Sequence, residues 1–386
     1  MKVLQVQTGG SYNARYYRPH ELTLSKSLVK LGHQVTLFTS DRYPKWQALE
    51  DRRAEKSVDT IDGVTIRRYP SGPETGVVSL MPTLFVEIMK FDWDILHAHT
   101  ILAPSSFYSA IASALKKRPL VVTQHEYSFF NAHGVKLFFH RLNNTTSGRY
   151  TVKRASAVIG LSSSAAVFVQ GFGAAKAKTV VIPSSVDTTL FCPGRKSLVK
   201  EKWGLEGPIV LYVGRLREEK SVDVLFRAFR ELSMKVLNSK LVLVGKGPQE
   251  NELRQMQIRL GLKNVCFLGR VPQEDMPRIY PGCDLLVLPS LYEPFGNVVL
   301  EGLASGLPVV GSEIGGIADV ITNGETGFHI RPGSAKDLSK YMQLLLKDDG
   351  LRKTMGAAAR KLAVERFDDM VVAKKVESLY YQCVKR

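Results

Sequence analysis

Short runs of aliphatic and β-branched residues alternate along this chain with amphipathic stretches of helix length. The alternation is typical of parallel β-sheets that are covered by helices on both faces. In the first half it predicts strands at residues 3–7, 34–38, 64–67, 95–98, 120–123, 157–160 and 180–182. In the second half it predicts strands at residues 209–213, 241–244, 265–268, 285–288, 309–310 and 328–330. We therefore expect an α/β fold with two doubly wound, Rossmann-like domains in tandem.

A passage rich in proline, glycine and serine, residues 183–194, predicts a linker between the two halves. We assign residues 1–187 to a first domain and residues 188–366 to a second. Residues 367–386 place aliphatic and aromatic side chains at helical spacing and predict a closing helix. The length of 386 residues also favours two domains, because a single hydrophobic core stops growing at about 250–300 residues.

Composition and charge narrow the class of protein. Hydrophobic residues make up 44% of the chain and charged residues 23%, as in ordinary folded proteins, so disorder is not expected. The net charge of +17 favours polyanionic partners such as phosphate-bearing substrates, an anionic membrane surface or nucleic acid. A solvated basic surface without a partner is the alternative. Nucleic acid is the least expected partner, because no nucleic-acid motif accompanies the charge.

The cysteines and the longest uncharged stretch indicate the cellular compartment of the protein. The 4 cysteines are scattered and never fall in a Cys-x-x-Cys spacing, which argues against a disulfide framework or a structural zinc site and fits a reducing compartment. The first residues look like a strand rather than the apolar core of a signal peptide. A buried strand, a serine cap and a helix explain residues 155–175 better than a membrane span does. We expect a cytoplasmic location.

Ligands of open α/β sheets bind beyond the carboxyl ends of the strands, so the loops there should carry the chemistry. After the first strand of the second half, Arg215 and Lys220 lie on a turn into a helix and can converge on the two phosphates of a diphosphate. Gly214 and Gly245 keep their loops free of side-chain bulk, which lets a ligand approach the backbone. Exposed basic residues beside a helix start are the plain alternative for the cationic pair.

The strongest signal follows the predicted strand at 285–288. Glu293 lies in a loop, residues 295–297 open a helix, and Glu301 lies one turn beyond Asn297 on the same helical face. Unpaired N–H groups at that helix start suit a phosphate. The carboxylate of Glu301 can accept hydroxyls of a ribose, and that of Glu293 can accept hydroxyls of a sugar. One motif can thus hold three parts of a nucleotide sugar.

The loops of the first half give weaker signals. Gly9 and Gly10 follow the first strand and allow close approach of a ligand, although such a pair is as often only a tight turn. His99 and His125 each lie at or just past a strand end, where the ligand should lie, yet a lone histidine is more often structural. Their spacing does not resemble a zinc site, and no Asp-x-Asp pair suggests a metal-held diphosphate. We expect no metal.

Several motifs occur in the same order as in the retaining glycosyltransferases of family 4, which the chain resembles over nearly its whole length. The motifs are Gly9-Gly10, Gly32-His33-Gln34-Val35, His97-Ala98-His99, Phe191 with Pro193, Gly214-Arg215 with Glu219-Lys220, Glu293 with Glu301, and residues 303–310. The resemblance implies the GT-B fold, in which two Rossmann-like domains face each other across a cleft and the C-terminal helix crosses back to the first domain.

The resemblance also implies an activity. A hexose-type sugar would move from a GDP- or UDP-sugar to a hydroxyl of a growing glycan or a lipid-linked acceptor, with retained anomeric configuration and without a metal or other cofactor. A leaving phosphate oxygen would accept the acceptor's proton, and cations with the helix N-terminus would neutralise the diphosphate. Catalytic roles would fall to His125, Arg215, Lys220 and Glu293.

The resemblance assigns further contacts. The backbone of Phe295, Gly296, Asn297 and Val298 would hold phosphate, Glu301 the ribose, and the base would lie near Val271. His125 is similar to the family's histidine that contacts the donor sugar, and His20 and His99 are candidates on the acceptor side. The departures from the family pattern are Ser184-Ser185 in place of Asn-Gly, Ser221 in place of glycine, and a longer stretch between Gly10 and His20.

Other functions fit parts of the pattern. Glu293 and Glu301 suit the acid and nucleophile of a retaining glycoside hydrolase if their carboxyl groups lie about 5 Å apart. A sugar-nucleotide epimerase of the same fold would need no acceptor. A non-catalytic two-domain sugar-binding protein is the third alternative.

Residues 127–154 interleave aromatic and basic side chains. We predict that they make a peripheral contact with an anionic membrane, on its cytoplasmic face, and with a lipid-linked acceptor. A core-packing helix with a solvated basic face explains the same pattern equally well.

Overall fold

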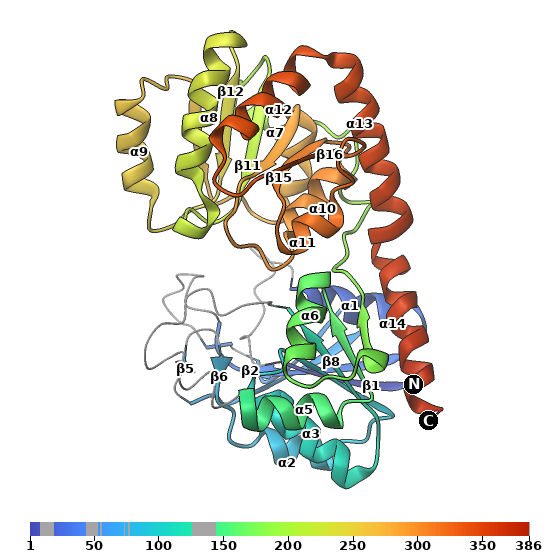
Figure 1. Ribbon diagram of the computed structural model, residues 1–386. Coiled ribbons are helices and arrows are strands. Elements are labelled where there is room, and N and C mark those ends of the chain that lie inside the picture. The colour runs from blue at the N-terminus through green and yellow to red at the C-terminus, as the bar shows by residue number, and fades with distance from the viewer. Residues whose placement is uncertain are drawn as a thin grey trace. The chain divides into compact units, whose positions relative to one another are not determined.

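A computed structural model of the chain divides into two units, each described here by itself (Figure 1). Unit 1 comprises Met1–Ser184 and Asp369–Arg386, and unit 2 comprises Ser185–Asp368. The residues that the structure describes are 1–7, 19–43, 53–54, 56–72, 74–75, 78–125 and 144–385. In this described part no helix is both long and apolar enough to cross a membrane.

Unit 1 is built on an eight-stranded sheet in the order β10-β9-β8-β7-β1-β2-β4-β3. All neighbours pair in parallel except β3, which runs antiparallel to β4. The strands are β1 (Lys2–Val6), β2 (Gln34–Ser40), β3 (Val58–Ile61), β4 (Val64–Tyr69), β7 (Ile95–His99), β8 (Leu120–Gln124), β9 (Ala157–Gly160) and β10 (Thr179–Val181), with a separate pair β5 (Glu74–Thr75) and β6 (Val78–Ser79). The strands predicted for this half are confirmed. The edge strand β3 escaped prediction because its side chains are exposed or half-buried, so it carries no hydrophobic run.

Helices cover both faces of the sheet of unit 1. They are α1 (His20–Lys30), α2 (Leu84–Lys90), α3 (Pro104–Lys116), α5 (Arg149–Arg154), α6 (Ser163–Gly171) and α14 (Asp369–Val384), with short helical turns at Asn144–Gly148 and Lys176–Lys178. Successive strand residues point to opposite faces, so Val3 packs with α1 and α14 while Leu4 packs with α2, α3, α5 and α6. This two-sided burial explains why the strands read as continuous hydrophobic runs.

The uncharged stretch 155–175 folds as predicted, as the strand β9 followed by the helix α6. The helix starts at a serine cap, because Ser162 Oγ accepts a hydrogen bond from the Ala165 N–H at 3.1 Å.

Unit 2 contains a six-stranded, fully parallel sheet in the order β13-β12-β11-β14-β15-β16. The strands are β11 (Ile209–Val213), β12 (Lys240–Val244), β13 (Val265–Gly269), β14 (Leu285–Leu288), β15 (Val309–Ser312) and β16 (Gly327–Ile330). The helices are α7 (Leu198–Trp203), α8 (Val222–Lys235), α9 (Glu250–Arg259), α10 (Asn297–Ala304), α11 (Gly315–Val320), α12 (Ala335–Lys347) and α13 (Asp349–Leu362), with short helical turns at Glu218–Lys220, Met276–Arg278, Tyr280–Gly282 and Ala363–Phe367. The strands predicted for this half are confirmed as well.

Each sheet has one point at which the strand order reverses. In unit 1 the strands that follow β1 in sequence, beginning with β2, lie on one side of β1, and the later strands, beginning with β7, lie on its other side. In unit 2 the same reversal lies between β11 and β14. Ligands of doubly wound sheets bind beyond the carboxyl ends of the strands at such a reversal. The loops after β1 and β7, and after β11 and β14, are therefore where sites are expected.

The chain passes from unit 1 to unit 2 after Ser184 and returns at Asp369. Within unit 2 the two passages are joined, because Val186 forms a parallel bridge with Asp368 and the Thr188 hydroxyl donates to an Asp368 carboxylate oxygen at 2.6 Å. The helix α14 then packs on α1 of unit 1 (Figure 1). The closing helix that returns to the first domain is thus confirmed.

The loops at the carboxyl ends of β11, β12 and β13 are joined by backbone hydrogen bonds. Gly214 N donates to Val244 O at 2.9 Å, and Gly245 N donates to Gly269 O at 2.7 Å. Gly245 has φ +135°, and a Cβ at this position would lie 1.9 Å from the Gly214 carbonyl oxygen. Close approach of two loop backbones, in addition to any role in ligand binding, therefore requires glycine at position 245.

We expect the substitution Gly245→Ala to destabilise unit 2 by at least about 2 kcal/mol, because the loops must separate to admit the methyl group. Chemical denaturation followed by circular dichroism measures the loss. Gly350→Ala is the matched control, since Gly350 is an exposed residue in the first turn of α13 with φ outside the left-handed region. That change should alter stability by no more than about 1 kcal/mol. Equal stabilities of the two variants would contradict the packing argument.

Candidate functional site

The helix α10 begins directly beyond the carboxyl end of β14, at the strand reversal of unit 2. Gly296 precedes it with φ +86°, and the Val299 N–H returns to the Gly296 carbonyl at 2.8 Å. The first N–H groups of a helix, here those of Asn297 and Val298, have no acceptor within the helix. Asn297 is exposed, whereas Phe295 is buried and anchors the turn. The predicted anion-binding helix start is therefore present as a structure, and ligand binding by it stays a prediction.

Lys220 and Glu293, which come from the loops after β11 and β14, form a mostly buried ion pair. The Lys220 ammonium donates to Glu293 Oε2 at 2.6 Å, and the two side chains are 9% and 14% exposed. The two loops are also joined through the backbone, because the Leu291 N–H donates to the Glu219 carbonyl at 2.8 Å. An ammonium has three donors and a carboxylate about four acceptor positions, so both groups keep capacity for a ligand.

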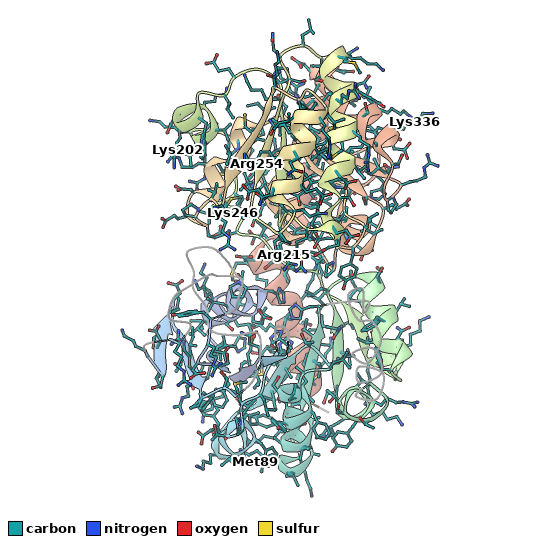
Figure 2. The ribbon with its side chains drawn as sticks, turned by 90° about the vertical axis from the view of Figure 1, so that its left-hand side faces the viewer. Met89, Lys202, Arg215, Lys246, Arg254 and Lys336 are labelled. Carbon is teal, nitrogen blue, oxygen red and sulfur yellow. The ribbon has the colours of Figure 1, made fainter. Side chains whose placement is uncertain are left out.

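Arg215, labelled in Figure 2, lies in the same loop as Lys220 and, unlike Lys220, is exposed. Among the described residues its guanidinium has no ion-pair partner. Its carbonyl oxygen accepts a hydrogen bond from the Tyr212 hydroxyl at 2.9 Å, which fixes the start of the loop. Burial and the nearby Glu293 carboxylate raise the pKa of Tyr212, so this hydroxyl remains a neutral donor.

Glu301 lies one turn into α10, as predicted, and is held by a residue that the sequence did not single out. The Tyr280 hydroxyl donates to Glu301 Oε2 at 2.5 Å. Tyr280 is fully buried, and burial together with the Glu301 carboxylate raises its pKa, so the phenol stays protonated. No local pattern marks Tyr280, because it lies on a short turn 21 residues before its partner.

The remaining predicted donor residues lie at the same strand ends. Gly214 and Gly245 directly follow β11 and β12, and Val271 follows β13 as a half-buried residue. Gly9 and Gly10 lie outside the described residues. The structure thus groups the candidates of unit 2 along one edge of its sheet.

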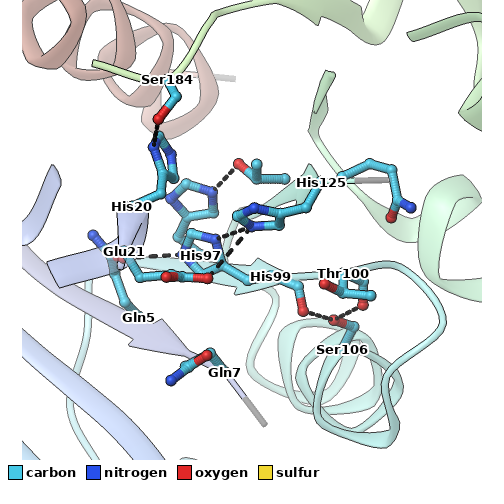
Figure 3. A network of polar contacts seen from close by, with 12 residues as sticks. Gln5, Gln7, His20, Glu21, His97, His99, Thr100, Ser106, His125 and Ser184 are labelled. Atoms are coloured by element: carbon cyan, nitrogen blue, oxygen red, sulfur yellow. Dashed lines mark hydrogen bonds and ion pairs between the residues drawn. The ribbon is translucent and has the colours of Figure 1, made fainter. Parts of the chain in front are cut away.

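Four histidine side chains gather at the strand reversal of unit 1 (Figure 3). They are His20 of α1, His97 and His99 of β7, and His125 directly after β8. His99 Nδ1 lies 3.2 Å from His125 Nε2, and His99 Nε2 lies 3.0 Å from Gln5 Oε1. The predicted candidates His20, His99 and His125 are therefore neighbours in space. His20 reaches the linker, with its Nδ1 3.2 Å from the Ser184 hydroxyl.

Glu21 joins this cluster and was not predicted. Its Oε1 lies 3.5 Å from His125 Nε2, and its side chain is only 11% exposed. Glu21, His99 and His125 each present one atom suited to bind a metal ion, and these atoms lie within 4.8 Å of one another. The sequence showed Glu21 only as an acidic residue in the first turn of a helix, where carboxylates are common.

The innermost histidine is held from both sides. His97 Nδ1 lies 2.6 Å from the Tyr380 hydroxyl of α14, and His97 Nε2 lies 2.7 Å from Thr123 Oγ1. The His97 and His99 rings stack with centroids 4.5 Å apart. Burial lowers the pKa of His97 to about 3, and burial likewise lowers the pKa values of His20, His99 and His125. The four imidazoles are therefore uncharged at neutral pH.

Two residues that depart from the family pattern have definite local roles. Ser184 contacts His20, as described above. Ser221 adopts φ +49°, a left-handed conformation that suits glycine better than serine. The glycine that is usual at position 221 would therefore fit this backbone.

The segment 127–154, predicted to contact a membrane, lies largely outside the described residues. Its described part includes α5, where Arg154 donates to the carbonyl oxygen of Ser113 at 2.7 Å. The membrane contact stays a prediction.

Comparison with known proteins finds a glycosyltransferase family profile in each half of the chain. A family profile described as "Glycosyl transferases group 1" matches residues 195–362, and one described as "Glycosyltransferase Family 4" matches residues 20–190. The D-inositol 3-phosphate glycosyltransferase of Corynebacterium aurimucosum is 26% identical over 98% of this chain and 94% of its own length. The N-acetyl-alpha-D-glucosaminyl L-malate synthase of Bacillus anthracis is 24% identical over 94% and 92%.

Solved structures show the same fold. The protein HepE of Anabaena, solved in complex with UDP, superposes with a TM-score of 0.79 at 23% identity over 99% of this chain and 100% of its own. The same protein has also been solved in complex with UDP-glucose. The sucrose-phosphate synthase of Thermosynechococcus elongatus superposes with a TM-score of 0.78 at 21% identity over 99% and 98%.

The buried histidines predict how stability depends on pH. Their folded-state pKa values lie below the value of about 6.5 in the unfolded chain, so the unfolded state binds more protons as pH falls below that value. The contribution of these histidines to the free energy of unfolding of unit 1 should therefore be fully present above about pH 7 and decline as pH falls. His97, with a pKa of about 3, should contribute up to roughly 1.4 kcal/mol per pH unit below the unfolded value. Urea unfolding between pH 7.5 and about 5 measures this slope.

The variant His97→Gln removes that contribution, together with the effect of His97 on the pKa values of His20 and His99. Its free energy of unfolding should fall less steeply with decreasing pH than that of the wild type, by about one proton. Only the slopes of the free energy of unfolding against pH are compared, so an overall loss of stability in the variant does not affect the result. Identical slopes would show that His97 does not titrate on unfolding.

Proposed function

Because the chain belongs to the group 1 and family 4 type of glycosyltransferases and has the GT-B fold, we propose that it is a retaining enzyme that transfers a hexose-type sugar from a nucleoside-diphosphate sugar to a hydroxyl group. The observation that carries the proposal is the set of groups at the strand reversal of unit 2. There the paired Lys220 and Glu293, the exposed Arg215 and the start of α10 lie on loops from neighbouring strands.

These groups match the charge of a nucleoside diphosphate. Arg215 supplies an exposed planar cation, Lys220 supplies ammonium donors beyond the one bonded to Glu293, and the N-terminus of α10 supplies backbone N–H groups. Such preorganised donors stabilise the negative charge that develops on a leaving diphosphate. The proposed transfer therefore uses these groups in place of a metal ion.

The two glutamates serve different parts of the donor in this proposal. Glu293 accepts hydroxyls of the transferred sugar, while its bond to Lys220 holds the carboxylate in place. Glu301, oriented by Tyr280, accepts the hydroxyls of the ribose. A hydrolase would need one protonated carboxyl as general acid. A carboxylate bonded to an ammonium is a poor acid, which disfavours the hydrolase reading of Glu293.

Uridine is the first donor base to test, because HepE of Anabaena was solved with UDP and UDP-glucose. The relatives named above point to small anionic acceptors, since their names include an inositol phosphate and L-malate. A net charge of +17 favours acceptors of that kind. We propose His20, His99 and His125 as residues on the unit 1 side of the reaction, with His125 contacting the transferred sugar.

Nucleotide binding tests the donor site. UDP, GDP and ADP, each with its glucose derivative, are added to the protein, and the melting temperature is followed by differential scanning fluorimetry. We expect one nucleotide class to raise the melting temperature, since a ligand that binds only the folded state stabilises it. The variant Arg215→Ala should keep the fold and weaken that ligand by about tenfold, because it removes one charge-assisted contact.

Lys336→Ala is the matched control for Arg215→Ala. It also removes an exposed cation from unit 2, but from α12 (Figure 2). Its melting-temperature shift with nucleotide should equal that of the wild type. If no nucleotide shifts the wild type, or if the two variants lose affinity equally, the donor site is wrongly assigned.

Product stereochemistry tests the reaction. The enzyme is incubated with an α-linked UDP-hexose and a panel of hydroxyl acceptors that begins with inositol 3-phosphate and L-malate, and the products are examined by proton NMR. We expect an α-linked product, which shows retention. Glu293→Gln keeps the shape of the side chain but removes its charge, and it should lower kcat at least about tenfold.

The same NMR experiment distinguishes the alternatives. A β-linked product would overturn retention. Interconversion of the UDP-sugar without acceptor would indicate an epimerase, and cleavage of an aryl glycoside in place of transfer would indicate a hydrolase.

A further inference from the structure

His125 directly follows β8, and its two ring nitrogens face different surroundings (Figure 3). Its Nε2 lies 3.2 Å from His99 Nδ1 and 3.5 Å from Glu21 Oε1. Its Nδ1 has no hydrogen-bond partner among the described residues, and the side chain is 23% exposed. Burial lowers the pKa of His125, so the neutral ring carries one proton. The position of that proton decides whether Nδ1 donates or accepts a hydrogen bond.

The proton of His99 is fixed by another neighbour. Gln5 Oε1 lies 3.0 Å from His99 Nε2, and an amide oxygen can only accept. His99 Nε2 therefore donates to Gln5, which leaves a lone pair on Nδ1 of this neutral ring. Gln5 is fully buried, and the rings of His97 and His99 stack, so both partners are held in place. Because His99 Nδ1 accepts, the hydrogen bond between His99 and His125 is donated by His125 Nε2.

Glu21 favours the same position of the His125 proton. At 3.5 Å its Oε1 is farther from Nε2 than in a strong hydrogen bond, so it acts on the ring mainly through its charge. A carboxylate attracts an N–H and repels a nitrogen lone pair, and burial strengthens both effects. The Glu21 side chain is 11% exposed, and within the described ranges no lysine or arginine pairs with it. His20, which also faces His125 from α1, is neutral.

We propose that Glu21 is a positioning residue for the transfer reaction. Together with Gln5 and His99, it keeps the proton of His125 on Nε2, so that the lone pair of Nδ1 accepts a hydrogen bond from a hydroxyl group of the transferred sugar. The proposal rests on the function proposed above, in which His125 contacts that sugar. Glu21 itself touches neither the sugar nor the nucleotide and acts through the ring of His125.

The fixed proton selects the kind of sugar that His125 can hold. A nitrogen that only accepts binds a hydroxyl group, which can donate, and disfavours a carboxylate or keto oxygen, which cannot. Leaving such a pair of acceptors unmatched in a site closed to water is costly. The carbon of the sugar next to His125 Nδ1 therefore bears a hydroxyl group, and the donor is a neutral hexose at that position.

Nuclear magnetic resonance of the full-length protein tests the position of the proton without any substrate. The 8 histidines are labelled with nitrogen-15, and long-range correlations between ring hydrogens and ring nitrogens show which nitrogen is protonated. The variant His125→Gln identifies the His125 signals by their loss. We expect His125 and His99 to carry their protons on Nε2 near neutral pH. In Glu21→Gln both tautomers of His125 should appear, because the amide offers an N–H as well as an oxygen.

Kinetics with a UDP-hexose test the role of Glu21 in transfer. Glu21→Gln is nearly isosteric, and its circular dichroism spectrum checks that the fold is intact. We expect kcat to fall about fivefold, because the sugar loses a fixed hydrogen-bond partner, while the rise in melting temperature with UDP alone stays that of the wild type. Glu21→Asp keeps the charge and should retain more activity than Glu21→Gln, although it shortens the side chain.

Glu377→Gln is the matched control. It also removes a carboxylate that faces a histidine of unit 1, since Glu377 Oε1 lies 2.8 Å from His33 Nε2. His33 precedes β2, at the edge of the sheet opposite to His125, so kcat and the His125 tautomer should be those of the wild type. Equal kcat values of the two Glu→Gln variants, or a His125 proton on Nδ1 in the wild type, would overturn the role of Glu21 alone. Absence of transfer by the wild type would overturn the proposed function and, with it, this role.

Discussion

Parallel strand pairing is the constraint on which the placement of both candidate sites depends. In a parallel sheet every strand ends at the same edge, and each connection must cross over as a helix. Where the chain reverses its direction of filling, at β1 and β7 or at β11 and β14, the loops diverge and leave room beyond the strand ends. The histidine cluster and the Lys220–Glu293 pair both lie at such reversals. Neither group of residues is contiguous in sequence, yet the topology brings each group together.

Burial sets the electrostatic character of the two sites in opposite ways. In unit 2 the mostly buried Lys220 and Glu293 form an ion pair in which each group faces one of opposite sign, in the same loop region as the exposed Arg215. In unit 1 burial keeps the histidines neutral. One site is therefore suited to bind the charge of a diphosphate, and the other presents nitrogen lone pairs and a single carboxylate.

Hydrophobic runs predicted the central strands of both sheets, because strands buried on two faces consist almost entirely of apolar residues. The sequence also marked Lys220 and Glu293, which lie in loops after buried strands, and Glu301, which lies on the helix after the second of these loops, as candidates. Tyr280 and Glu21 were missed for a physical reason. A tyrosine on a short turn and a glutamate in the first turn of a helix are common in any protein, and only the tertiary fold places them against Glu301 and His125. Pairing across such distances leaves no mark in local sequence.

The C-terminal helix shows how far such pairing extends. Its 16 residues, Asp369–Val384, add Val372, Val376 and Tyr380 to the core beneath one face of the sheet of unit 1. The hydroxyl of Tyr380 bonds His97, whose ring stacks on His99. Since this core is incomplete without α14, unit 1 needs the last part of the chain to bury that face of its sheet. The end of the chain therefore supports His97, because Tyr380 of α14 contacts it through both a hydrogen bond and its ring.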